Sequence, residues 1–435
     1  MARDKTRDLR KMGRRNFVKT LSAMGVSGAA LKYMTKDALA KYTDDPKDEI
    51  PRLERLETPK EEMCERGVSG TEYIEANIER KPVYYTIPRD KWVTIETAYD
   101  AASRLSERLK RRKAFGGGSI TVGVTTTTSG HKRRKSVRVT HSTVKRKGYE
   151  QDDEGGEVRI TYEEDAPEIE YDELVDMLPG SIDGSVGSGE YEETVEDIPV
   201  IHRKIVEEEQ SSFTDEYRPV VGGCQFRPNR YLPPIGTLGT PAIDYERGEP
   251  VMVTAAHVVD DDLGDLMYQP GGIGAGIGYQ DRTAYNPPDT GDDIFYDVAT
   301  IDLTEVDTPV SAEWHLADYG GGKYGDIDGT ICEDALKDKY EGNTNEDLWH
   351  QGRTTGRKSG YVDEIVPSDH SGGLGVVEAD GFDTDDGDSG GPYWVTSEDD
   401  IYIAGIHARS RPRGNMMWDV EQFWDIEVLN LYPDC

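Results

Sequence analysis

The chain has 435 residues, which is enough for two ordinary domains and a substantial buried core. Its formal net charge is −34, and the acidic excess is uneven. From Pro219 onward there are 42 acidic and 13 basic residues, whereas the residues before it include 43 acidic and 38 basic ones. Nucleic acids and anionic membranes are bound through Lys and Arg, so this balance argues against both as partners of the C-terminal half.

Carboxylates occur in nearly every loop of that half, and the whole chain has only 7 Phe. This composition resembles that of proteins from salt-loving archaea; an ordinary acidic protein is the alternative.

The four cysteines, Cys64, Cys224, Cys332 and Cys435, lie far apart and show no Cys-x-x-Cys spacing. We therefore expect no zinc site. We also expect no other metal and no cofactor. One disulfide, between Cys224 and Cys332, and unpaired buried thiols are both open alternatives.

Residues 1–40 have the pattern of a targeting segment. A basic start leads into Gly-Arg-Arg-Asn-Phe-Val-Lys at residues 13–19, then into small, weakly apolar residues, and Ala38-Leu39-Ala40 offers a cleavage site. The pattern resembles a twin-arginine export signal. The apolar run is too short to span a membrane stably, because a spanning helix needs about 20 apolar residues. We expect a secreted or cell-surface protein without stable membrane insertion once the signal is cleaved; a disordered basic tail is the alternative.

Residues 41–215 predict a smaller α+β region whose residue types select no chemistry. Helices are expected at 72–80, 99–113 and 171–178, and strands at 119–128, 136–145, 157–162 and 198–202. The basic residues 131–135 are expected at a hairpin tip, and the Gly- and Ser-rich residues 181–190 form an expected flexible joint. A pro-segment, a folding aid and a binding module are all open as roles, and we place the domain boundary between Glu209 and Arg218.

Residues 216–435 predict an all-β domain, because short apolar runs alternate there with Gly, Pro and Asp turns. Strands are expected at 236–238, 251–254, 297–303, 359–365, 375–378, 391–395 and 402–407. A closing helix is expected at 421–431. The glycines of residues 271–278 precede no helical pattern, so they indicate a loop rather than a nucleotide site.

Three short stretches of this domain carry residues with chemical potential. His257 ends Thr-Ala-Ala-His, Asp297 begins Asp-Val-Ala, and Ser389 lies within Gly-Asp-Ser-Gly-Gly-Pro at residues 387–392. Taken singly, they could be an ordinary histidine, a turn aspartate and a glycine turn. Together, in the order His, Asp, Ser within one β-rich domain, they predict nucleophilic catalysis, since a serine hydroxyl needs an adjacent base that a third group orients.

The three stretches resemble the landmarks of the chymotrypsin-like serine proteases, in that family's order. The resemblance covers residues 219–435 and implies two packed six-stranded β-barrels and peptide-bond cleavage through an acyl-enzyme. It implies that His257 is the general base, that Asp297 orients it and that Ser389 is the nucleophile. The amides of Gly387 and Ser389 would form the oxyanion hole, and Asp388 would shape the loop.

Further stretches resemble parts of the same family, but they leave specificity open. Residues 352–360, Gly-Arg-Thr-Thr-Gly-Arg-Lys-Ser-Gly, resemble a hairpin of bacterial members. Asp383 falls where trypsin-like members hold the acid that binds Arg or Lys, whereas His407 falls where glutamate-cutting members place a histidine. The run at residues 220–223, Val-Val-Gly-Gly, resembles the activated N-terminus of animal members, but we interpret it as a loop signal.

The sequence therefore predicts an exported serine endopeptidase, adapted to high salt, that acts as a monomer on polypeptide substrates. A catalytically silent, protease-like binding module at the cell surface is one alternative. A hydrolase of the same fold that acts on esters or only on its own chain is another. The intact set of three residues and the oxyanion glycine argue against the silent module, which has no need of them.

Overall fold

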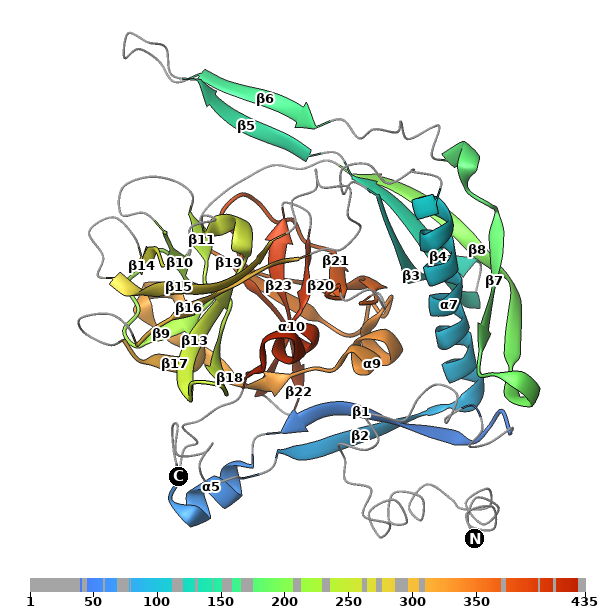
Figure 1. The fold of residues 1–435 in the computed structure, drawn as a ribbon, viewed down its shortest axis with the longest axis horizontal. Helices are drawn as coiled ribbons and strands as arrows, with labels where there is room; N and C mark the ends of the chain where they lie inside the picture. The colour runs from blue at the N-terminus through green and yellow to red at the C-terminus, as the bar shows by residue number, and fades with distance from the viewer. Residues whose placement is uncertain are drawn as a thin grey trace.

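A computed structural model of the chain describes most of its residues after the N-terminal segment. The described residues are 40, 45–57, 59–68, 78, 80–111, 120–129, 132–142, 144–150, 159–165, 175–205, 213–228, 235–259, 264–270, 276–285, 296–304, 310–368, 373–397, 400–409 and 412–428. The expected signal segment before Ala40 lies outside them, as does most of the helix expected at 72–80. The described chain is mostly β, with a closed six-stranded barrel and further sheets (Figure 1).

The six-stranded barrel contains two of the predicted strands and adds one from the end of the chain. Its strand order is β14-β15-β16-β13-β12-β25. The strands are β12 (Thr240–Asp244), β13 (Glu249–Thr254), β14 (Leu266–Tyr268), β15 (Gly276–Tyr285), β16 (Asp297–Asp302) and β25 (Ile426–Glu427). β13 and β16 pair antiparallel and are buried almost throughout, as expected for runs rich in Val, Ile and Ala. A short neighbouring pair joins β10 (Gln225–Phe226) to β11 (Gly236–Thr237).

A second, 13-stranded sheet runs through both the N-terminal region and the C-terminal half. Its main path is β7-β8-β4-β3-β20-β19-β22-β23-β18-β17-β9, with β21 and β24 attached to β20 and β23. The strands are β3 (Ile120–Ser129), β4 (Lys132–Ser142), β7 (Ser181–Val186), β8 (Glu193–Ile205), β9 (Val220–Gly222), β17 (Ala312–Ala317), β18 (Lys323–Thr330), β19 (Leu348–Gly352), β20 (Gly356–Val366), β21 (Val376–Asp380), β22 (Pro392–Ser397), β23 (Asp400–Arg409) and β24 (Arg413–Met416). The two parts of the chain thus share one sheet.

The N-terminal region lies along one side of the C-terminal half (Figure 1), and its strands β3, β4, β7 and β8 belong to the long sheet. Its hairpin β1 (Glu49–Glu57) and β2 (Lys81–Pro88) leads into the long helix α7 (Arg89–Arg111). The short helix α5 (Lys60–Arg66) and the hairpin of β5 (Val144–Glu150) with β6 (Arg159–Asp165) complete it. α7 buries Trp92, Ile95, Tyr99 and Leu105 on one face, with the spacing of an amphipathic helix. The predicted helix therefore begins ten residues earlier than expected.

Three sequence expectations about local structure were wrong. Residues 132–135, expected at a hairpin tip, belong to strand β4 and pair with β3. Residues 181–190 form strand β7 and the short 3₁₀ turn η1 (Gly189–Tyr191), not a flexible joint. The glycine at 184 allows close packing, because a Cβ there would collide with the Thr97 carbonyl of α7. The closing helix α10 spans Met417–Trp424 rather than 421–431. It ends at Asp425, whose φ of 54° is left-handed, and the next residues form β25.

The disulfide considered between Cys224 and Cys332 is not formed. Both are free, buried thiols that belong to different hydrophobic clusters. The sulfur of Cys224 donates to the carbonyl of Val221, and that of Cys332 to the carbonyl of Leu53. Cys64 is disulfide-bonded.

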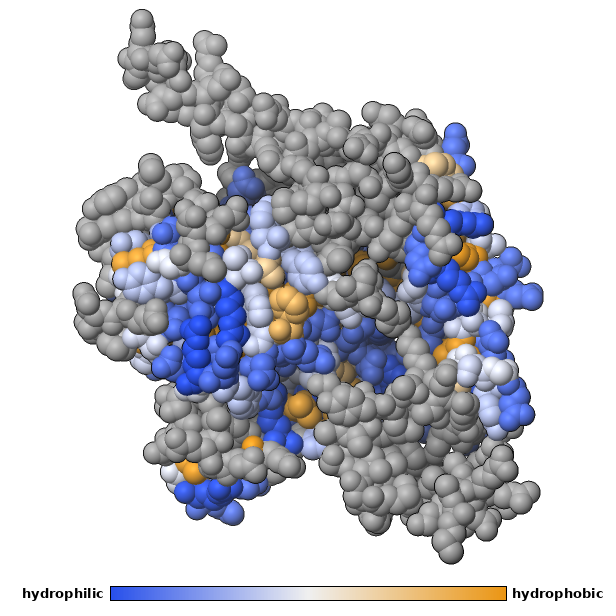
Figure 2. Space-filling model, in the orientation of Figure 1, coloured by the Kyte–Doolittle hydropathy of each residue, from blue (hydrophilic) through white to orange (hydrophobic). Residues whose placement is uncertain are grey.

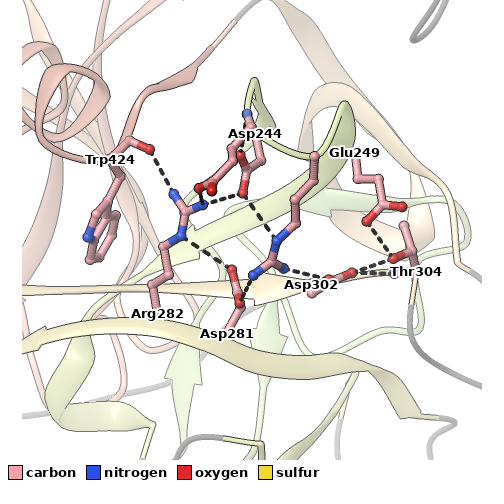
Figure 3. Close-up of polar contacts among 9 residues, drawn as sticks. Asp244, Glu249, Asp281, Arg282, Asp302, Thr304 and Trp424 are labelled. Carbon is pink, nitrogen blue, oxygen red and sulfur yellow. Dashed lines mark hydrogen bonds and ion pairs between the residues drawn. The ribbon is translucent and has the colours of Figure 1, made fainter.

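Carboxylates gather around two arginines at one end of the barrel (Figure 3). Arg282 donates to Asp244 at 2.6 Å and to the carbonyl of Trp424 in α10 at 2.7 Å. Arg247 donates to Asp302 at 3.0 Å and to Asp281 at 2.5 Å. The network ties the C-terminal helix to the barrel.

Hydrophilic residues also cover most of the coloured surface in Figure 2. Within the described ranges, no helix has both the length and the apolar character that crossing a membrane requires.

Candidate active site

His257 and Asp297 lie side by side at the edge of the six-stranded barrel. His257 belongs to a 3₁₀ turn, η2 (Ala256–Val258), directly after β13, and Asp297 begins the adjacent strand β16. The imidazole Nδ1 lies 2.7 Å from Asp297 Oδ2, and the main-chain N–H of His257 donates to Oδ1 at 3.0 Å. Since a carboxylate only accepts, Nδ1 carries the proton and Nε2 is left as the basic nitrogen.

The carboxylate is buried, whereas the imidazole is accessible. The side chain of Asp297 is 1% exposed and that of His257 is 32% exposed. A further contact fixes Asp297 from the other sheet: its main-chain N–H donates to the side-chain oxygen of Asn415, in β24, at 3.0 Å. The His–Asp pair is therefore held between the barrel and the long sheet.

Ser389 lies in a glycine turn whose backbone the sequence motif makes possible. Gly387 and Gly390 have φ angles of 96° and 91°, which favour glycine. A Cβ on Gly390 would collide with the carbonyl of Thr237 and the hydroxyl of Thr254, three residues before His257. The serine turn thus packs against the end of β13 that leads to the histidine.

Thr237, in β11, fastens this turn from the barrel side. Its main-chain N–H donates to the carbonyl of Ser389 at 2.8 Å, and its hydroxyl donates to the carbonyl of Gly387 at 2.7 Å. The same hydroxyl accepts the main-chain N–H of Arg353 at 2.9 Å. Thr237 and Asn415 were not among the predicted site residues. No sequence motif marks them, because their roles depend on contacts between distant segments.

Asp388 is fully buried and organises the turn by accepting four hydrogen bonds. They come from the amides of Thr354, Thr355 and Asp385, at 2.7, 3.0 and 3.0 Å, and from the Thr355 hydroxyl at 2.7 Å. Burial acts to raise the pKa of Asp388, but nearby His350 and the Thr355 hydroxyl outweigh it, so the pKa lies below its ordinary value. The Gly-Arg-Thr-Thr-Gly stretch at residues 352–356 therefore supplies three of the four hydrogen bonds to this carboxylate.

The amides of Gly387 and Ser389 have no acceptor among the described residues. By contrast, the neighbouring amides of Asp388, Gly390 and Gly391 all donate to main-chain carbonyls. Two unengaged donors beside a serine are what an oxyanion hole requires. The Ser389 hydroxyl and the His257 imidazole are not hydrogen-bonded to each other here; such contacts often tighten only when substrate binds.

The two candidate specificity residues lie in contrasting environments. Asp383 is exposed, six residues before the serine. His407 is fully buried in β23; its Nδ1 lies 2.5 Å from the Tyr393 hydroxyl, and its ring centre lies 5.0 Å from that of His350. Burial lowers the pKa of His407 well below its usual value, helped by the charge of His350, so the ring is neutral at pH 7. Its main-chain carbonyl accepts from the Gly390 amide, and its amide donates to the Gly391 carbonyl, in the turn that contains Ser389.

Among the described residues, no group of three or more His, Cys, Asp or Glu side chains is placed to hold a metal ion. A scan of protein-family models and a search of curated protein sequences both return no match to this chain.

Proposed function

We propose that the chain is a serine endopeptidase with a chymotrypsin-like pair of barrels, in which Ser389, His257 and Asp297 cleave peptide bonds. The observation that carries the proposal is the buried Asp297 carboxylate, which is hydrogen-bonded to both the Nδ1 and the main-chain amide of His257. This arrangement fixes one tautomer and stabilises the imidazolium that forms during acyl transfer. A merely structural histidine does not need an accessible, basic Nε2.

Each step of the reaction has a matching group on this chain. His257 Nε2 takes the proton of the Ser389 hydroxyl as the oxygen attacks the peptide carbonyl, and an acyl-enzyme forms when the proton passes to the leaving amine. Water then attacks the acyl-enzyme with the same base. The amides of Gly387 and Ser389 stabilise the oxyanion in both halves, and one such donor typically contributes about 100-fold or more in rate.

The catalytic turn needs no new N-terminus to hold its shape. The Asp388 carboxylate is already satisfied by four donors from the chain itself. Val220 and Val221 are buried in β9, which pairs with β17. These contacts support activity without cleavage at residues 220–223.

The proposal extends to the setting in which the enzyme works. The twin-arginine pattern of residues 1–40 and the dense carboxylates support export by the twin-arginine route into a salt-rich exterior, where the enzyme acts as a monomer on polypeptides. Asp383 and His407 support different residues at the cleaved bond: Arg or Lys for the first, Glu for the second. A digest of a peptide library, with Asp383→Asn and His407→Ala variants alongside, separates the two.

Labelling with a fluorophosphonate probe in concentrated NaCl tests the proposal. The wild-type chain should be labelled, the Ser389→Ala variant should not, and Asp297→Asn should be labelled at least 100-fold more slowly. No label on the native protein, or equal label on Ser389→Ala, would overturn the enzyme assignment. A casein digest then separates a general endopeptidase from an enzyme that cuts only its own chain.

A further inference from the structure

The N-terminal region and the C-terminal half of the chain both contribute to one of the two hydrophobic clusters. Val124 of β3 pairs with Ile365 of β20, so the long sheet passes from one part into the other without a break. One continuous cluster of buried side chains contains Trp92, Tyr99 and Leu105 of α7. The same cluster contains Leu336, Tyr340, Val362, Ile365, Val377 and Tyr402 from the C-terminal half. Neither part completes this core alone.

Main-chain contacts join the two parts at a second place. The segment after β18 lies against β1, where Arg55 forms an isolated β-bridge with Ile331. The amide of Cys332 donates to the carbonyl of Glu54 at 3.0 Å, and its thiol donates to that of Leu53 at 2.7 Å. Separation would break these hydrogen bonds and expose the main chain on both sides to water.

Buried charges are also matched across this junction. Arg52 of β1 lies 3.5 Å from the carboxylate of Asp338, which also accepts from the Tyr85 hydroxyl. In the C-terminal half, the buried carboxylate of Glu341 is bonded by Tyr99 and, at 2.8 Å, by Lys135. These charges are buried only while the two parts are joined, so separation would have to open the whole junction to water.

The junction reaches the candidate active site through a short series of strands. β20 meets the N-terminal region at Ile365 and also pairs with β21, where Ile365 faces Val377. β21 pairs with β24 through Val376 and Asn415, and Asn415 accepts the amide of Asp297. The N-terminal region therefore supports the strand that positions the catalytic aspartate.

From these contacts we infer that residues 45–205 are a permanent part of the catalytic body, and not a pro-segment that leaves after folding. If the connection to residue 213 is cut, the two fragments stay together as one particle. The interaction surface on the C-terminal half is β20 together with residues 331–343, and its partner is the face built by α7, β1 and β3 of the same chain.

The test is a full-length chain with a recognition sequence for a specific protease inserted between residues 205 and 213. After cutting, gel filtration in concentrated NaCl should give one peak of the uncut size that contains both fragments. Reductant must be present, so that the disulfide of Cys64 does not by itself hold the fragments. Probe labelling of Ser389 should stay within twofold of the uncut protein. Co-elution of the fragments does not depend on the proposed peptidase activity. Either proposal, the activity or the permanent association, can therefore be refuted without the other.

A pair of tyrosine variants sharpens the test. Tyr99→Ala removes a buried ring that bonds Glu341 and lies 4.3 Å from the Lys337 ammonium, so the cut fragments should associate at least tenfold more weakly. Tyr191→Ala, in the same region but away from the junction, should leave association unchanged. The inference is overturned if the cut wild-type fragments elute separately under native conditions. It is also overturned if the C-terminal fragment keeps its fold and reactivity after the N-terminal fragment is lost.

Discussion

Replacing Asp388 by Asn should damage the candidate active site without changing any of the three residues proposed to be catalytic. The aspartate accepts two amides at Oδ1, from Thr354 and Thr355, and the Thr355 hydroxyl and Asp385 amide at Oδ2. An asparagine can keep the Oδ1 contacts, but its NH₂ group would then face the Asp385 N–H, donor against donor. One lost charge-assisted hydrogen bond and one unsatisfied buried donor together cost about 2–4 kcal/mol of unfolding free energy.

The same change should displace the Gly387 and Ser389 amides that flank Asp388. We expect probe labelling to slow by about 100-fold, the usual effect of losing an oxyanion donor. Urea unfolding gives the stability, and the labelling rate in concentrated NaCl gives the reactivity. Asp347→Asn, an exposed carboxylate before β19, is the matched control and should change neither quantity. A labelling rate within twofold of wild type for Asp388→Asn would refute the role assigned to this carboxylate.

Two further predictions concern stability. Burial raises the pKa of Glu421 to about 7, against the opposing charge of Arg80, so the folded state retains this proton at pH values where the unfolded chain has lost it. Stability should fall as pH rises from about 4.5 to 7, and Glu421→Gln should reduce that loss by roughly 2–3 kcal/mol, measured as urea midpoints at pH 5 and pH 8. Arg282→Met leaves the buried Asp244 carboxylate without its nearest cation and should lower the unfolding free energy by about 3 kcal/mol. Lys323→Met, which breaks an exposed pair, should cost less than about 1 kcal/mol; equal losses would contradict the argument from burial.

The local features of the C-terminal half could be predicted from the sequence. Runs such as 251–254 and 297–303 are buried strands because β-branched residues and small apolar residues dominate them. The motif around Ser389 also specified its own backbone, since only glycine adopts the φ angles at 387 and 390 without strain. The resemblance to the serine-protease landmarks implied that Asp297 lies beside His257, and the two side chains are 2.7 Å apart.

Long-range contacts could not be predicted in the same way. Thr237 and Asn415 are ordinary polar residues in the sequence, and they matter only because the fold sets them beside Ser389 and Asp297. The glycine at 184 suggested flexibility, whereas its function is to let β7 approach α7. Pairing between Val124 and Ile365 has no local signature at all, since register across such a distance depends on the whole core.

The pairing of β12 with β25 joins two segments that lie far apart in the sequence. Ile243 faces Glu427 across that pair, so the barrel begun at residue 240 closes only when these distant segments meet. The long sheet likewise needs β3 from the first third of the chain and β20 from its last third. Closing loops of such length loses chain entropy before the distant contacts form, so folding should be slow. The barrel and the long sheet should then form together in one cooperative step.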